Sequence, residues 1–108
     1  RIMPIYFPSQ LDVVQTATPT TGQTVVMTDS SQSGTLYLTP AGTLAALTVT
    51  LPSNANSVIG QIRRIGTNNI ITTLTINGAA SILGTVTTLA LGGSASFQKV
   101  ASDTWIKI

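Results

Sequence analysis

Over most of its length the chain alternates an apolar residue with Thr or Ser. The clearest case is residues 47–51, where Leu47, Val49 and Leu51 alternate with two threonines. Successive side chains of a strand point to opposite faces, so this period of two predicts half-buried β-strands. No apolar stripe at helical spacing is long enough to predict a helix, and residues 44–47 could form one helical turn at most. The pattern therefore predicts an all-β chain.

Turn-forming residues divide this pattern into about 8–10 short strands, a rhythm typical of a β-sandwich or a barrel-like domain. Asn77-Gly78 is a strong β-hairpin signal, so the strands are expected to be mostly antiparallel. Gly66-Thr-Asn-Asn69 is predicted to be a turn. The predicted strands are residues 23–28, 35–39, 47–51, 58–65, 70–76, 81–83, 86–91, 94–100 and 104–108.

One short motif occurs twice. Ile71-Thr-Thr-Leu74 and Val86-Thr-Thr-Leu89 are each followed by a turn that contains glycine. A solenoid generally needs three or more repeats, so two copies are too few to predict one. The motif instead indicates consecutive hairpins with similar strands.

The N-terminal segment differs from the rest of the chain. Residues 1–22 contain three of the five prolines, and proline favours extended backbone without donating an amide hydrogen bond. We therefore predict an extended N-terminal arm over residues 1–22, followed by a β domain over residues 23–108. The alternative is that this segment is an ordinary edge strand of the same domain. An arm would contact a neighbour or its own domain through its large apolar residues, which are Ile2, Ile5, Tyr6 and Phe7.

Charge is scarce in this chain. It has 108 residues, which suits one domain, and 43% are hydrophobic, which allows a single core. Only 7% are charged, against about 25% in an average soluble domain. Such a surface is poorly solvated, which predicts that other subunits cover part of it. Arg63 and Arg64 are candidate interface residues, and the alternative is that one or both are simply solvated.

Two classes of partner are not expected. The five cationic residues are not clustered on one face, because neighbours such as Arg63 and Arg64 point to opposite sides of a strand. Nucleic-acid binding is therefore not predicted. No apolar run approaches the ~18 residues of a membrane-spanning helix, so no membrane partner is predicted either.

The residues needed for catalysis or metal binding are nearly absent. The chain has no Cys, no His and no Glu, and its three acidic residues, Asp12, Asp29 and Asp103, lie in separate segments. This composition disfavours acid–base pairs, catalytic triads and zinc sites. We expect no enzyme activity, no metal and no cofactor, and we interpret each Asp as a turn or cap residue.

Three aromatic residues could belong either to the core or to a binding surface. Phe97 and Trp105 lie in neighbouring C-terminal strands, where large aromatic side chains usually fill a core. We predict that they do so here. Tyr37 has the polar tip that is common in protein and carbohydrate contacts.

Several segments resemble the C-terminal β modules of tailed-bacteriophage virion proteins. The resemblance covers about residues 35–108 and lies in Thr35–Pro52, Ile59–Arg63, Leu74–Gly78 and Phe97–Trp105. Such modules occur in capsid decoration (cement) proteins and in tail-fibre or spike tips. The resemblance implies an all-β homotrimer located in the virion, with the major capsid protein or other virion proteins as partners. It supplies no catalytic residue.

The first functional hypothesis is therefore a structural protein of the virion that decorates and stabilises the capsid. The alternative is a tail-fibre or spike module that binds a receptor, including a glycan on the host surface. A second alternative is a carbohydrate-binding or adhesin module of cellular origin. That alternative requires a row of exposed aromatic residues, and the chain has few to supply one.

Overall fold

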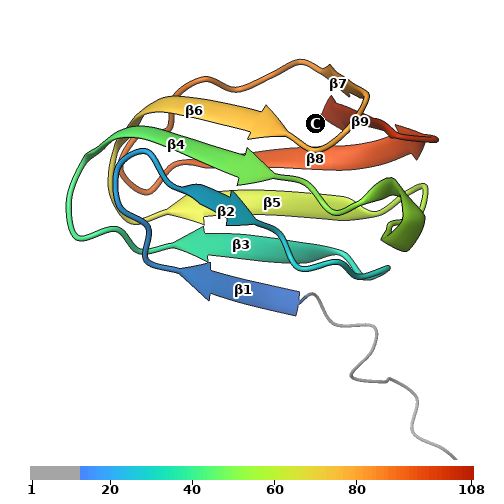
Figure 1. Cartoon of the computed structure of the whole chain (residues 1–108), viewed down its shortest axis with the longest axis horizontal. Coiled ribbons are helices and arrows are strands. Elements are labelled where there is room, and N and C mark those ends of the chain that lie inside the picture. The colour runs from blue at the N-terminus through green and yellow to red at the C-terminus, as the bar shows by residue number, and fades with distance from the viewer. Residues whose placement is uncertain (1–12) are drawn as a thin grey trace, which may run out of the picture.

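The computed structural model describes residues 13–108 and confirms that this part of the chain is all-β (Figure 1). Its strands are β1 (Val13–Ala17), β2 (Thr24–Val26), β3 (Gly34–Leu38), β4 (Leu44–Thr50), β5 (Ile62–Thr67), β6 (Ile71–Asn77), β7 (Ser81–Leu83), β8 (Ser94–Ala101) and β9 (Thr104–Lys107). A short 3-10 helix, η2 (Asn54–Asn56), connects β4 to β5. The predicted and observed strands agree closely between residues 70 and 83 and from residue 94 onward.

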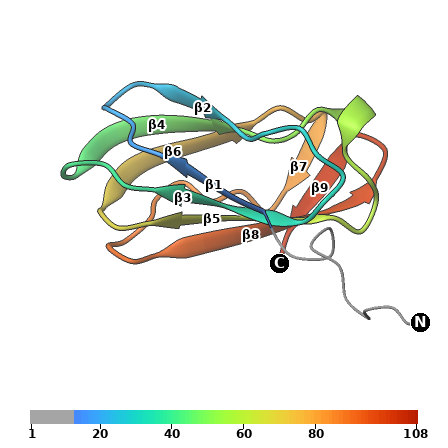
Figure 2. The ribbon, with the colours of Figure 1, turned by 90° about the horizontal axis from the view of Figure 1, so that it is seen from below.

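The strands form two sheets that face each other (Figure 2). The large sheet has the order β1-β3-β5-β8-β9-β7, and the small sheet has the order β2-β4-β6. From β1 to β6 the chain crosses to the other sheet after every strand. Each pair of consecutive strands is thus one coil, and the coils stack through parallel pairing. The arrangement is solenoid-like, so the prediction of a sandwich or barrel was wrong in its architecture.

The predicted antiparallel pairing was also wrong. Within residues 13–108, five of the seven strand pairs are parallel, and the two antiparallel pairs are β5–β8 and β8–β9. The turn at Asn77-Gly78 exists, but it carries the chain from β6 in the small sheet to β7 in the large one. A turn sequence specifies a local reversal, and it does not specify which strand becomes the hydrogen-bonded neighbour. The interpretation of the repeated motif as consecutive hairpins fails for the same reason.

Some local predictions also differ from the structure. Residues 44–47 form the start of β4 and not a helical turn, because the amide of Leu44 donates to the carbonyl of Ile70 (2.9 Å). Residues 58–61 precede β5 as a turn. Residues 86–91 form no strand, although Leu89 makes an isolated antiparallel bridge with Ile71 along the free side of β6.

The N-terminal segment is divided by the structure. Residues 13–17 are an edge strand, β1, which pairs with β3 in the large sheet. The edge-strand alternative therefore describes these five residues. Residues 18–22 of the predicted arm connect β1 to β2. Its first twelve residues, which include Ile2, Ile5, Tyr6 and Phe7, lie outside the described residues.

The core lies between the two sheets and is built from aligned apolar positions of successive coils. Leu36 of β3 is in register with Ile65 of β5 in the large sheet, and Val49 of β4 is in register with Ile76 of β6 in the small sheet. All four side chains belong to the buried core. Phe97 and Trp105 have no exposed surface, which confirms their predicted place in the core.

A polar side chain closes the first coil. Gln15 of β1 occupies the inward position that Leu36 and Ile65 occupy in the next two coils. Its amide donates to the carbonyl of Val26 (2.9 Å) and accepts from the amide of Thr28 (2.8 Å). Terminal repeats of solenoids generally need such polar caps, because their outer side has no neighbour.

Candidate functional site

The acidic residues that the structure describes have structural roles. The carboxylate of Asp29 accepts hydrogen bonds from the backbone and hydroxyl of Ser53 (2.8 and 3.0 Å) and from the amide of Asn56 (2.9 Å). These bonds lower the pKa of Asp29, and the bond from the Ser53 backbone amide has the largest effect. Asp103 has a positive φ of 51° in the β8–β9 turn. Within residues 13–108 no group of three or more His, Cys, Asp or Glu side chains could hold a metal ion.

Two cationic side chains are buried at the end of the core where β5 begins. Lys99 is 3% exposed, and its ammonium donates to the carbonyls of Asn54 and Ser57 (both 3.1 Å) and to the Ser57 hydroxyl (2.9 Å). Its three donors are therefore satisfied by the loop that contains η2. Lys99 fixes that loop and does not face an external ligand.

Arg63 is the second buried cation, also 3% exposed. Its guanidinium donates to the carbonyl of Thr28 (2.7 Å), and its Nε has no hydrogen-bond partner within the described residues. Burial lowers the pKa of Arg63, and the carboxylate of Asp29 partly opposes this effect. The side chain thus links β5 to the loop after β2.

Arg63 and Arg64 do point to opposite faces of β5, as predicted: Arg63 is buried and Arg64 is exposed. Because Arg63 is held inside the chain, the predicted interface role remains a prediction for Arg64.

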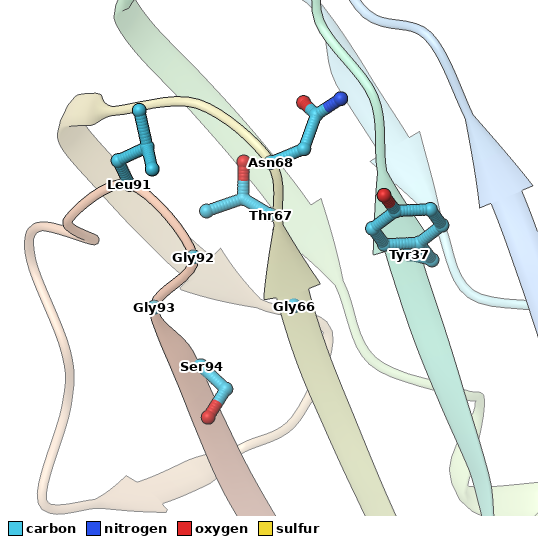
Figure 3. A pocket seen from close by; sticks show the side chains of 8 residues that line it. All are labelled: Tyr37, Gly66, Thr67, Asn68, Leu91, Gly92, Gly93 and Ser94. Atoms are coloured by element: carbon cyan, nitrogen blue, oxygen red, sulfur yellow. The ribbon is translucent and has the colours of Figure 1, made fainter.

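An uncharged pocket lies on the outer face of the large sheet, where β3 and β5 end and β8 begins (Figure 3). Its volume is about 430 Å³. Three of its eight lining residues are glycines, and none is charged. The lining comprises Tyr37, Gly66, Thr67, Asn68, Leu91, Gly92, Gly93 and Ser94.

Strand register positions the centre of this pocket. Tyr37 is paired with Gly66, and Gly66 is paired with Ser94, so the three residues lie side by side across β3, β5 and β8. The alternation of β3 turns Leu36 and Leu38 into the core and therefore turns Tyr37 outward, where it is 42% exposed. The period-two pattern of the sequence thus places an aromatic ring beside a residue without a side chain.

Hydrogen bonds hold the rim of the pocket. The backbone amide of Asn68 donates to the carbonyl of Leu38 (3.1 Å), and the backbone amide of Thr67 donates to the carbonyl of Gly93 (3.2 Å). The Thr67 hydroxyl donates to the carbonyl of Asn69 (2.7 Å). The two rim loops are thus attached to the ends of β3 and β5.

Gly66 is the residue that the sequence analysis missed. It was predicted to begin a turn, whereas β5 continues through it to Thr67. Glycine inside a strand often marks a point where a ligand or another backbone comes close. That signal becomes visible only when the strand is known to extend past the glycine.

Large apolar side chains are exposed on several other elements. The most exposed of those described are Leu91 (67%), Ile59 (66%) and Val14 (64%). The others are Val26, Val58, Ile70, Leu83, Val100 and Ile108. They are spread over β1, β2, β7 and β8, the turns before β5 and β6, the pocket rim and the C-terminal end.

Among the described residues there is no helix of the length and apolarity that crossing a membrane requires. The comparisons with known proteins found no match to this chain among protein-family models, curated proteins or solved structures.

Proposed function

We propose that this chain is a non-enzymatic structural protein of a bacteriophage particle, which decorates the capsid and stabilises it through homo-oligomeric contacts. The resemblance of residues 35–108 to virion β modules motivates the location. The observation that carries the assembly role is the combination of very low charge with large exposed apolar side chains such as Val14 and Ile59. Neighbouring subunits would cover such side chains in an assembled particle, as we expect for a surface with so little charge.

The free edge of β1 supports the same proposal. Val13 and Ala17 bond to the residues that flank β3. The backbone amide of Val13 donates to the carbonyl of Ser33 (3.1 Å), and the carbonyl of Ala17 accepts from the backbone amide of Thr39 (2.8 Å). In a parallel pair, alternate residues bond to the same neighbour, so the backbone groups of Val14 and Thr16 face the other side. No strand of residues 13–108 covers that side. The edge also lacks the Lys or Pro that often blocks strand addition.

The first experiment is to measure the mass of the purified chain by light scattering, alone and after incubation with phage shells that lack decoration. We expect an oligomer, with a trimer as the specific prediction, that binds the shells and protects them from heat. A stable monomer that ignores the shells would contradict the proposal.

A pair of variants makes this test sharper. Val14→Lys adds a charge at the exposed edge, and Val14→Thr keeps a β-branched neutral residue there. If the edge is used for assembly, the Lys variant should have a lower mass and weaker shell binding, and the Thr variant should behave like the original chain. Equal assembly of both variants would exclude β1 from the contact.

A second candidate function is a receptor-binding module of a tail fibre or spike. The specific observation in its favour is the uncharged pocket beside Tyr37. A chain that ignores shells and adheres to host cells would support this candidate. The cellular carbohydrate-binding alternative needs a row of exposed aromatic residues, and Tyr37 is the only exposed one within residues 13–108.

A further inference from the structure

We propose that the pocket beside Tyr37 binds a neutral sugar unit, with the pyranose ring on the Tyr37 side chain and its hydroxyls on Asn68 and Ser94. This inference does not depend on the proposed role in capsid assembly. Three features of the pocket indicate the class of ligand. They are the floor at Gly66, the aromatic wall formed by Tyr37, and the rim with Asn68 and Ser94.

The floor of the pocket gives the first argument. Glycine weakens the interior of a strand, so a structural reason for it is expected. Gly66 has none of the usual reasons: its φ is outside the left-handed region, and a Cβ built there would have no atom within 4 Å. The pairing with β3 and β8 is also regular at this residue, without a bulge. What remains is a role in keeping the floor open for a ligand.

An aromatic side chain can also compensate for a glycine by lying over it in the neighbouring strand. Tyr37 is in the correct register to do so with Gly66. The empty space around the Gly66 Cβ position excludes this arrangement, because the ring would then be within 4 Å. Figure 3 likewise shows the ring standing at the side of the pocket, away from Gly66.

The aromatic wall gives the second argument. Phe97 and Trp105 are fully buried, whereas Tyr37 is 42% exposed. An aromatic face carries slight negative charge and is apolar, which suits the C–H face of a pyranose. The volume of about 430 Å³ lies in the lower part of the usual range for small-molecule sites, which is roughly 300–1,000 Å³. This size fits one or two sugar rings.

The rim gives the third argument. The side-chain amide of Asn68 and the hydroxyl of Ser94 can each donate and accept hydrogen bonds, as the adjacent hydroxyls of a sugar require. The side-chain oxygen of Asn68 already accepts one long bond from the Asn69 side-chain amide (3.4 Å), so the Asn68 NH2 group is assigned to the ligand. Both residues line the pocket: Ser94 lies beside Gly66 on β8, and Asn68 follows the end of β5 (Figure 3). Because the lining has no charged residue, the bound part of the ligand is expected to be neutral. The Thr67 hydroxyl bonds to Asn69 and is not assigned to the ligand.

A different occupant would be the proline-containing segment of residues 1–12 from a second copy. Extended proline-rich segments dock into grooves lined by several aromatic rings. This pocket has one aromatic ring and a floor of glycines, which favours the C–H face of a single sugar ring.

The test uses the full chain and a panel of uncharged oligosaccharides built from glucose, galactose, mannose and N-acetylglucosamine. Binding is detected first on an array and then by saturation-transfer NMR at millimolar sugar. We expect at least one member of the panel to bind the original chain. Absence of binding in both assays would overturn the proposal.

Two pairs of variants locate the binding. Tyr37→Ala should reduce affinity at least tenfold, and Tyr37→Phe should retain most of it because the ring remains. Gly66→Val should also reduce affinity at least tenfold, because its side chain fills the floor, without lowering the thermal unfolding temperature. The matched control is Gly42→Val, since Gly42 also has open space around its Cβ position but lies outside the pocket.

The assembly state of these variants is measured in parallel. If Gly66→Val lowers the mass of the chain in solution and leaves sugar binding unchanged, the pocket is a contact between subunits and the proposal is wrong. Loss of sugar binding at unchanged mass supports it, whatever the outcome of the shell-binding experiment.

Discussion

Trp105 is the largest side chain without exposed surface, and it fills the core next to Ile82 and other apolar residues. Trp105→Ala should lower the free energy of unfolding by about 3–5 kcal/mol, because it removes buried contacts and leaves a cavity. Urea unfolding checks this value. The control is Leu91→Ala, at a residue that is 67% exposed, which should change stability by about 0.5 kcal/mol or less. Loss of ligand binding at unchanged stability would instead assign Trp105 to a site.

The hydrogen bonds at Asp29 predict a pH dependence of stability. They lower the pKa of Asp29 in the folded state below that of the unfolded chain, so the unfolded state takes up the proton first as the pH falls. The stabilisation is therefore complete above the unfolded pKa of about 3.9 and is lost as the pH falls through the folded pKa.

Asp29→Asn should accordingly flatten the dependence of unfolding free energy on pH in the acidic range, measured by urea unfolding at several pH values. Ser53→Ala keeps the backbone amide, which contributes most to the shift, and should retain most of the dependence. Identical acid profiles for the original chain and Asp29→Asn would show that the carboxylate is not stabilised by these bonds.

At the scale of elements, Gly78 determines how β6 connects to β7. Its φ is 103°, and a Cβ there would lie 2.9 Å from backbone atoms of Leu51 and from the Thr50 side chain. Gly78→Ala should therefore destabilise the fold by about 1–3 kcal/mol or more, as measured by thermal and urea unfolding. Gly42 is a glycine in an exposed turn with neither constraint, and Gly42→Ala should be neutral or stabilising by up to about 1 kcal/mol. Equal effects at the two glycines would contradict the observed backbone at β6–β7.

The polar cap of the first coil is a second property of an element. Gln15→Leu removes both hydrogen bonds to the end of β2 and leaves the carbonyl of Val26 and the amide of Thr28 without that partner. We expect a loss of about 1–3 kcal/mol in unfolding free energy. Gln15→Glu keeps an acceptor for Thr28 but places a carboxylate against the Val26 carbonyl, so it should also destabilise. If Gln15→Leu is as stable as the original chain, the glutamine is not needed to close this end.

Sequence patterns were informative about elements where the relevant interaction is local. The alternation of Leu36, Tyr37 and Leu38 correctly indicates a strand, and the turn at Asp103 correctly ends β8. The prediction that the strand ends before Gly66 was wrong. Hydrogen-bonded pairing with β3 and β8 continues through Gly66, although the local sequence favours a turn there. The pocket was missed for the same reason, although Tyr37 had been singled out.

At the scale of the whole molecule, the N-terminal segment is predicted to serve assembly more than folding. Deleting residues 1–8 leaves every described strand in the chain. The truncated protein should unfold at a similar urea concentration and have a lower mass in solution by light scattering. A truncated chain that fails to fold would show that these residues belong to the folded domain.

The coils were not visible as a sequence repeat because they are unequal in length. Val13, Gly34 and Arg63 occupy the same register position in β1, β3 and β5, but they are separated by 21 and 29 residues. Stacking requires only that inward-facing positions of successive strands match, and the connecting loops can differ freely. A fixed period is therefore not needed for a solenoid-like arrangement of a few coils.

The sequence by itself determined the all-β class, most strands after residue 70, the burial of Phe97 and Trp105, and the opposite directions of Arg63 and Arg64. These follow from side-chain alternation and turn chemistry, which act over a few residues. Only the tertiary structure decided the parallel stacking, the burial of Arg63 and Lys99 and the pocket at Tyr37 and Gly66. These depend on which distant strands become neighbours, because a strand presents the same backbone hydrogen-bonding groups to any partner, and the choice is made by packing of the whole core.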